Sequence, residues 1–229
     1  MRAPELEFLY EDNHLIIVNK KCGELVQGDK TGDKSLLDDI KDFIKIRDKK
    51  PGNVYLGLIH RLDRVTSGAI VYAKTSKALS RMNEKFKSRK VDKTYWALCT
   101  PLAPNQPTEG TLTHYLRKNS KNNTVTVFPR PTDGAKKAVL HYKLIKKLDR
   151  YWLFEIELET GRSHQIRAQM AKIGAIIKGD LKYGADRSNK DGGIHLHARY
   201  LSFEHPVTKE PVSVTAPLPD DNLWNACED

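Results

Sequence analysis

The sequence is poor in cysteine, with only Cys22, Cys99 and Cys227 among its 229 residues. These three are odd in number, lie far apart and do not form the CxxC spacing that zinc and redox sites use. The pattern argues against a disulfide framework or a zinc site, and we expect no metal. A reducing cytoplasm is the simplest location for such a chain.

Long apolar runs are absent as well. The first ten residues contain Glu5 and Glu7 and no long apolar core, which is unlike a signal peptide. No apolar run approaches the length that spans a membrane, and no internal repeat or low-complexity tract divides the chain. The length fits one domain. We therefore expect one soluble, cytoplasmic domain over residues 1–229, and a monomer because no feature marks an oligomer interface.

Acidic residues are too few to balance the basic ones. The chain has 29 Asp and Glu against 39 Lys and Arg, which gives a formal charge of +10. Such an excess favours a polyanionic partner, since basic groups that bind phosphates release counterions. The excess indicates a nucleic acid, with a solvated lysine-rich surface as the alternative.

Short runs rich in β-branched and aromatic residues predict strands along most of the chain. They lie at residues 15–18, 56–59, 69–73, 93–98, 194–198, 201–203 and 212–214. Residues 111–116 with 124–128, and 139–148 with 152–158, are typical of hairpins. Helical spacing follows Ser35, Ser76 and Ser163, which we expect to be N-caps. The sequence predicts an α/β fold of the α+β type, with a mixed, largely antiparallel sheet and flanking helices.

A polar nonapeptide, His60–Gly68, lies between two apolar runs. Arg61 and Arg64 flank Asp63, and nearby cations keep a carboxylate ionised. An ionised carboxylate is able to attack an electrophilic carbon. The hydroxyls and the glycine that follow suit a tight turn. On this local chemistry alone, a solvated surface loop is the favoured interpretation.

A second polar segment, Gly161–Arg167, stands where a strand gives way to a helix. Two arginines, Arg162 and Arg167, near a helix N-terminus are suited to holding an anion. The alternative is pairing with surface acids such as Glu157 and Glu159.

Tyr95 lies in a predicted strand, where core packing is the ordinary role of tyrosine. His195 and His197 share one face of another strand, but no third metal ligand is apparent, so we interpret them as bonded polar residues.

Six short segments of the chain stand in an informative order. Val18–Lys20 with Gly23, His60–Gly68, Lys93–Tyr95 and Gly161–Arg167 are followed by Gly179–Gly184, then by Leu196–Ala198 with His205–Pro206. Six such segments in this order resemble the RluA family of RNA pseudouridine synthases over nearly the whole chain. The resemblance implies the pseudouridine synthase catalytic fold, with an active-site cleft across its sheet.

The resemblance also implies roles for individual residues. Asp63 matches the catalytic aspartate, which is needed to detach uracil from ribose C1′ before it is rejoined through C5. Tyr95 matches the tyrosine that stacks on the target base, and Arg167 the arginine that pairs with the aspartate. Arg61 matches the arginine that fills the gap left by the flipped uridine. The remaining RNA-binding candidates are His60, Arg162 and Leu196.

The implied reaction isomerises a uridine in a stem-loop of ribosomal or transfer RNA and needs no cofactor. Many relatives carry an N-terminal S4 module, but Val18–Lys20 begins too early here to leave room for one. RNA recognition is then expected from the catalytic domain itself. Lys21, Cys22 and Gln169 depart from the usual family pattern, at positions that bear on substrate preference.

Two rival functions remain. A non-catalytic RNA-binding or ribosome-assembly factor on the same fold would explain the positive charge. A glycoside or nucleoside hydrolase would use Asp63 as nucleophile, but neither motif supplies the second carboxylate that such enzymes need.

Overall fold

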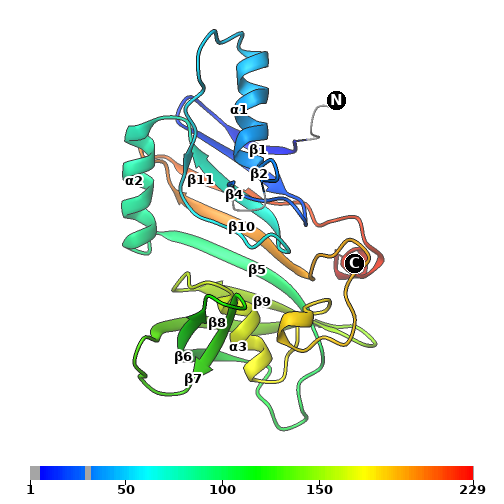
Figure 1. The fold of residues 1–229 in the computed structure, drawn as a ribbon. Helices are drawn as coiled ribbons and strands as arrows, with labels where there is room; N and C mark the ends of the chain where they lie inside the picture. Colours follow the sequence, from blue (N-terminus) through cyan, green and yellow to red (C-terminus); the bar gives the residue numbers. More distant parts are fainter. Residues whose placement is uncertain (1–5, 29–31, 229) are drawn as a thin grey trace. The chain divides into compact units, whose positions relative to one another are not determined.

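A computed structural model describes residues 6–28 and 32–228, which form two compact units. The described part of unit 1 comes from the segments Met1–Val91 and Ala198–Pro217, and that of unit 2 from Asp92–His197 and Leu218–Asp229. Figure 1 colours the chain in order, so that the return of the orange strand β10 to unit 1 can be followed. In the described part of the chain, no helix is long and apolar enough to cross a membrane.

Unit 1 is built on antiparallel strands. Strands β1 (Phe8–Glu11), β2 (Leu15–Lys20) and β4 (Ser67–Ala73) lie side by side, and β10 (Leu196–Glu204) follows β4. The short strand β3 (Gly57–Leu58) pairs with β4, while β11 (Pro211–Thr215) pairs with β10. The prediction of a largely antiparallel sheet is confirmed in this unit.

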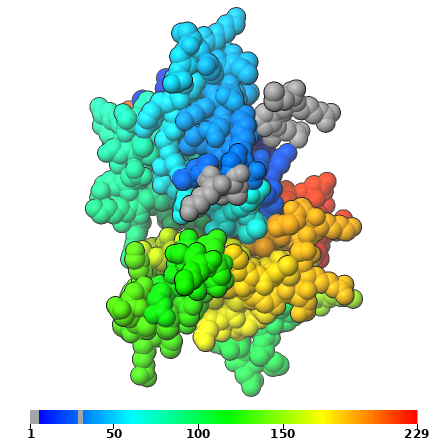
Figure 2. Space-filling view, in the orientation of Figure 1, coloured from blue at the N-terminus to red at the C-terminus, as the bar shows by residue number. Residues whose placement is uncertain are grey.

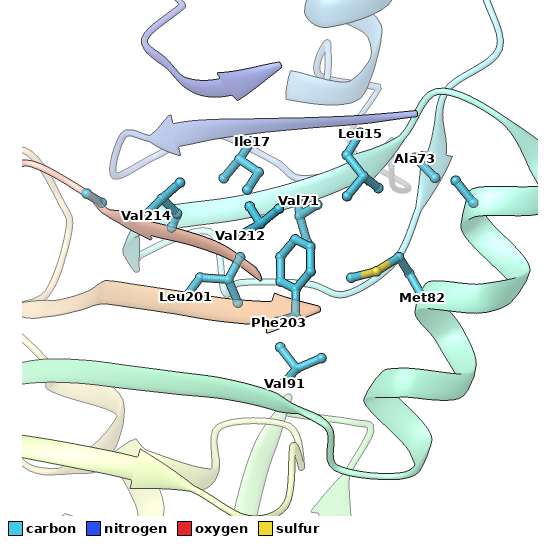
Figure 3. Packing of buried hydrophobic residues seen from close by; sticks show 13 residues of the cluster. Leu15, Ile17, Val71, Ala73, Met82, Val91, Leu201, Phe203, Val212 and Val214 are labelled. Carbon is cyan, nitrogen blue, oxygen red and sulfur yellow. The ribbon is translucent and has the colours of Figure 1, made fainter. Parts of the chain in front are cut away.

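The core of unit 1 lies between this sheet and helix α2 (Ser76–Lys87). All seven residues of β4 are buried, which explains why residues 69–73 form a continuous apolar run rather than an alternating one. Figure 3 shows side chains of β2, β4, β10 and β11 meeting Met82 of α2 and Val91 in one cluster. Full burial of such a side chain stabilises the fold by roughly 1.5–3 kcal/mol, so this cluster holds the sheet and α2 together.

The helices of unit 1 begin at capping residues. Helix α1 (Leu36–Arg47) starts after Ser35, which forms a capping box with Asp38, so this predicted N-cap is confirmed. Helix α2 starts after Thr75, whose hydroxyl accepts a hydrogen bond from the backbone of Ala78. The prediction of Ser76 as N-cap was wrong by one residue, because Thr75 has the extended backbone that a cap requires.

Unit 2 contains a second antiparallel array. Strands β5 (Val91–Cys99), β9 (Trp152–Leu158), β8 (Lys136–Lys147), β6 (Glu109–Asn119) and β7 (Thr124–Phe128) lie in this order. The hairpins β6–β7 and β8–β9 confirm both sequence predictions. Together the two units form an α+β fold with few helices, as the sequence predicted.

The helices of unit 2 pack on its strands. Helix α3 (Gln165–Lys172) places Ala168 against Leu116, Val125 and Ala138. The short 3-10 helix η1 (Leu181–Tyr183) follows α3 in the chain. The last helix, α4 (Asn222–Glu228), was not predicted and packs Trp224 and Cys227 onto Leu98 and Leu153.

The start of α3 differs from its prediction. Ser163 is not the N-cap, because the helix begins after His164, which has a left-handed backbone (φ 50°) and makes no side-chain cap bond.

Candidate active site

The loop that carries Asp63 is closed by a turn within unit 1. The backbone N–H of Thr66 donates to the carbonyl oxygen of Asp63 at 3.0 Å. Thr66 and Ser67 are buried, and Gly68 follows with φ 113°. A Cβ on Gly68 would lie 2.4 Å from the carbonyl oxygen of Ala198 on β10. Only glycine fits this backbone conformation and this close approach, so Gly68 fixes the end of the loop against the sheet.

Lys20, at the end of β2, hydrogen-bonds to the backbone of the same loop. Its side chain is 1% exposed, and its Nζ donates to the carbonyl oxygens of Thr66 at 2.7 Å, Lys21 at 2.9 Å and Arg64 at 3.1 Å. Burial lowers the pKa of Lys20 to about 8, and the negative charge of Asp63 is among those that oppose this shift. The three donor positions of the ammonium group are thus matched by three acceptors, two of them in the Asp63 loop.

The segment after Lys20 also forms hydrogen bonds with the Asp63 loop. The backbone N–H of Gly23 donates to the carbonyl of Arg64, and Arg64 Nε donates back to the carbonyl of Gly23 at 2.9 Å. The thiol of Cys22 donates to the carbonyl of Val65, and Arg64 also pairs with Asp33. The motif that contains Lys20 and Gly23 therefore shapes the Asp63 loop, although the two motifs are about forty residues apart in the chain.

The residues of the loop have different surroundings. Asp63 is partly exposed and Arg61 exposed, whereas Leu62 between them is buried. His60 Nε2 accepts a hydrogen bond from the backbone N–H of Val71 at 3.1 Å, and its ring stacks on Phe86 with 4.9 Å between centroids. His60 thus anchors the loop to β4 and α2, while Arg61 and Asp63 have solvent-accessible surface.

Unit 2 contains the second predicted constellation. Arg167 on α3 is 5% exposed and Asp180 is 1% exposed. Arg167 Nε and Nη2 each donate to one oxygen of the Asp180 carboxylate, both at 2.7 Å. This bidentate pair is buried and charge-assisted, which orients the guanidinium plane.

Tyr183 supports Arg167 from another side. The guanidinium carbon lies 5.1 Å from the centre of the Tyr183 ring, within the range of a cation–π contact. The Tyr183 hydroxyl accepts from the backbone N–H of Val125 at 3.0 Å and is hydrogen-bonded to His164 Nδ1 at 2.9 Å. One tyrosine therefore links strand β7, the start of α3 and the buried arginine.

The start of α3 is held by Gln165 rather than by a capping hydroxyl. Gln165 Oε1 accepts from the Thr160 hydroxyl at 2.8 Å and from the backbone of Arg162 at 3.0 Å, and its Nε2 donates to Val139. Arg162 itself is exposed, and its Nε donates to the carbonyl oxygen of Lys137. Arg162 thus contacts the backbone of strand β8.

Tyr95 and Leu196 are both buried in unit 2. Tyr95 lies on β5 opposite Ile156 of β9. Lys93 precedes it by two residues on the same face of the strand, and burial lowers the pKa of Lys93.

The two predicted strand histidines are polar residues of the interior. Asn189 Nδ2 donates to His195 Nδ1, whose Nε2 lies 3.1 Å from an oxygen of Asp221. Among the described residues, no group of three or more His, Cys, Asp or Glu side chains is placed to hold a metal ion.

Two residues of these networks were missed by sequence reasoning. Asp180 lies in the Gly179–Gly184 segment, which reads as a turn, and nothing in the spacing of thirteen residues points to Arg167. Lys20 ends a strand whose first four residues are aliphatic and buried, and that position was the available signal that its side chain is enclosed.

The chain was compared with known proteins. Residues 14–172 match the family model described as RNA pseudouridylate synthase. The protein YlyB of Bacillus subtilis, described as an uncharacterized RNA pseudouridine synthase, is 34% identical over 95% of this chain and 70% of the relative. Ribosomal large subunit pseudouridine synthase D of Xylella fastidiosa is 32% identical over 94% of this chain and 67% of the relative.

The fold has a matching solved structure. Human RNA Pseudouridylate Synthase Domain Containing 1 superposes with a TM-score of 0.74 and 26% identity, over 99% of this chain and 89% of that one. Fold and sequence therefore define an RNA-modifying isomerase. The chain belongs to the RNA pseudouridylate synthase family and, within it, to the RluA family.

Proposed function

We propose that this enzyme converts a uridine in a stem-loop of ribosomal or transfer RNA to pseudouridine, with Asp63 as the catalytic residue. The observation that carries the proposal is the match of residues 14–172 to the family model, because this range contains the Asp63 loop, Tyr95 and Arg167. Ribosomal RNA is the first substrate to test. A relative that aligns with 94% of this chain is named for the large ribosomal subunit.

The proposed reaction is an internal exchange of bonds. The bond between N1 of uracil and C1′ of ribose breaks, the base turns over, C5 bonds to C1′, and the proton from C5 is replaced by one on N1. All atoms stay in the product, so no oxidant, reductant or cofactor is required. Asp63 would act on the glycosidic bond, while Tyr95 would stack on the base and assist the proton transfer at C5.

The other site residues take supporting roles in this proposal. Arg167 would pair with Asp63 and orient it, and the Asp180 fork supports this by fixing the guanidinium. Arg61, which is exposed, would fill the gap that the flipped uridine leaves. His60 would contribute by anchoring the loop, and Leu196 would pack beneath the base.

We further propose that both units act as one catalytic domain, as a cytoplasmic monomer without a metal. RNA is the partner expected from the family and from the charge of +10. Exposed Arg162 is the residue of the second motif that is available for RNA contact.

The test is pseudouridine mapping of total RNA from cells that lack this gene. The same cells would carry either the wild-type gene or an Asp63→Asn copy. A site that is lost in the deletion and restored only by the wild type supports the proposal and identifies the RNA. RNA that is bound by the purified wild-type protein without any product would instead support the non-catalytic binding factor, and release of free uracil would support a hydrolase.

A further inference from the structure

Three neighbouring strands of unit 2 present an aromatic and basic row. Tyr115 of β6 is directly opposite Phe128 of β7 on one side and Lys137 of β8 on the other. Directly opposite residues in antiparallel strands point to the same face, with Cβ atoms about 4.5–5.5 Å apart. Phe128 and Tyr115 are both partly exposed, and Lys137 is exposed. Two rings and one ammonium group therefore stand side by side on one surface.

Arg117 extends this row along β6. It lies two residues after Tyr115, on the same face, and is exposed. Its guanidinium carbon is 4.8 Å from the centre of the Phe128 ring, and its Nη1 donates to the carbonyl of Asp133. The ring and the carbonyl hold the planar guanidinium in place, which lowers the entropy that this side chain would lose when it binds a phosphate or stacks on a base.

The charge around the row has one dominant sign. Residues 115–137 contain six Lys and Arg and a single acidic residue, Asp133. Arg162, outside this range, adds to the charge, since its Nε donates to the carbonyl oxygen of Lys137. Figure 2 shows the green hairpin segment beside the yellow segment that contains α3, and the row lies on the opposite face of these strands from α3. A basic surface with partly exposed rings fits a polyanion whose units also have flat apolar faces.

The row faces away from the side of the sheet that carries Tyr95. Leu116, the neighbour of Tyr115, packs with Ala138 against Ala168 of α3, and successive strand residues point to opposite faces. The pairing Tyr95–Ile156–Tyr142–Gly110 places Tyr95 on the same face as Leu116. The row is therefore distinct from the proposed base-stacking residue.

We propose that the face formed by Tyr115, Arg117, Phe128 and Lys137 binds a single-stranded RNA segment next to the substrate stem-loop. One base stacks on Tyr115, and the adjacent phosphates pair with Arg117 and Lys137. This inference rests on the proposed function, because it supplies a second RNA contact for the same enzyme. Single-stranded RNA fits better than duplex, since the bases of a duplex are stacked on one another and do not offer their faces.

The experiment measures binding of a fluorescently labelled single-stranded RNA of about 12 nucleotides to the full-length protein. Tyr115→Leu is expected to weaken binding about 5- to 150-fold through loss of stacking, whereas Tyr115→Phe keeps the ring and retains the affinity. Thermal melts of each variant verify folding. An affinity of Tyr115→Leu equal to that of Tyr115→Phe would overturn the stacking role.

Charge is tested with a matched pair of double variants. Arg117→Gln with Lys137→Gln is expected to lower the slope of log affinity against log salt by roughly 1.4, which is about 0.7 for each lost phosphate contact. Lys143→Gln with Lys147→Gln removes the same charge from exposed positions further along β8 and is expected to leave the slope unchanged. Equal slopes in both double variants would overturn the site.

Pseudouridine formation by the wild-type protein is measured separately. If the protein makes no pseudouridine, the proposed function fails, yet the binding data still decide whether this face holds RNA. The same measurement is made with a duplex RNA probe. If Tyr115→Leu weakened duplex binding as much as single-strand binding, single-stranded RNA would not be the preferred ligand of this face.

Discussion

The two motif regions bury one cation each, and they neutralise it in different ways. In unit 1, Lys20 is surrounded by three neutral carbonyl oxygens and holds a loop by its backbone. In unit 2, Arg167 is paired with a carboxylate, so side chains hold side chains. Burial disfavours the charged form of Lys20, and the neutral carbonyl groups around it do not fully compensate, so its pKa falls to about 8. The Asp63 loop therefore depends on pH and on the fit of its backbone, whereas the position of Arg167 depends on side-chain contacts such as those with Asp180 and Tyr183.

The largest effect is expected from the carboxylate partner. Asp180→Ala removes the bidentate carboxylate partner of the buried Arg167, and breaking a buried ion pair destabilises a fold by roughly 3–5 kcal/mol. Urea unfolding of the variant against the wild type measures this difference. A loss below about 1 kcal/mol would show that the pair does not hold α3 in the way the distances indicate.

The backbone fit of the Asp63 loop is tested at Gly68. Gly68→Ala places a methyl group against the backbone of Ala198 at a φ of 113°, and the combined strain and overpacking cost roughly 2–5 kcal/mol. Thermal unfolding measures the loss. Gly23→Ala is the matched control, because φ is also positive there (88°) but a Cβ would meet no atom within 4 Å. Equal losses would mean that φ alone, and not the approach to β10, explains the glycine.

A smaller, pH-dependent effect is expected at Lys20. The pKa of Lys20 in the folded state, about 8, lies below the ordinary lysine value of 10.5, so between these pH values the unfolded chain binds more protons and stability rises with pH. The gain in the free energy of unfolding that comes from the titration of Lys20 is complete above pH 10.5, where it amounts to roughly 3 kcal/mol relative to low pH.

Lys20→Met removes this titration. The free energy of unfolding of the wild type, minus that of the variant, should therefore rise between pH 8 and 10.5. A difference that stays flat over this range would contradict the buried, charge-destabilised state of Lys20.

The smallest effect is expected for an exposed pair of the same chemistry. Arg64 and Asp33 are also an arginine and an aspartate, 2.9 Å apart, but their side chains are 49% and 52% exposed. Asp33→Asn should change stability by no more than about 1 kcal/mol, because solvent screens the pair. A loss as large as that of Asp180→Ala would show that burial is not the cause of the difference.

Local patterns predicted much of the fold. The hairpin of β6 and β7 was predicted from its two strand patterns, and Ser35 caps α1 as predicted. Helix α4 escaped prediction because its seven residues have too few turns for a periodic signal. The N-caps at Thr75 and His164 show that a nearby serine does not by itself locate a helix start. The backbone conformation and the surrounding contacts decide which residue is the cap.

The sequence named candidate site residues, but it could not name their contacts. The motif order placed Asp63, Tyr95 and Arg167 in one family pattern, yet the partners of Lys20 and Arg167 depend on tertiary packing. Lysine is rarely fully buried, so the enclosure of Lys20 contradicts the ordinary expectation for its residue type.

The most direct test of the central claim is turnover by the purified protein. A uridine-containing ribosomal RNA fragment, chosen by the mapping experiment, is incubated with wild type and Asp63→Asn, and pseudouridine is quantified after digestion. The account predicts product with the wild type and none with the variant, while both give the same melting curve. Wild-type rates in Asp63→Asn would contradict it.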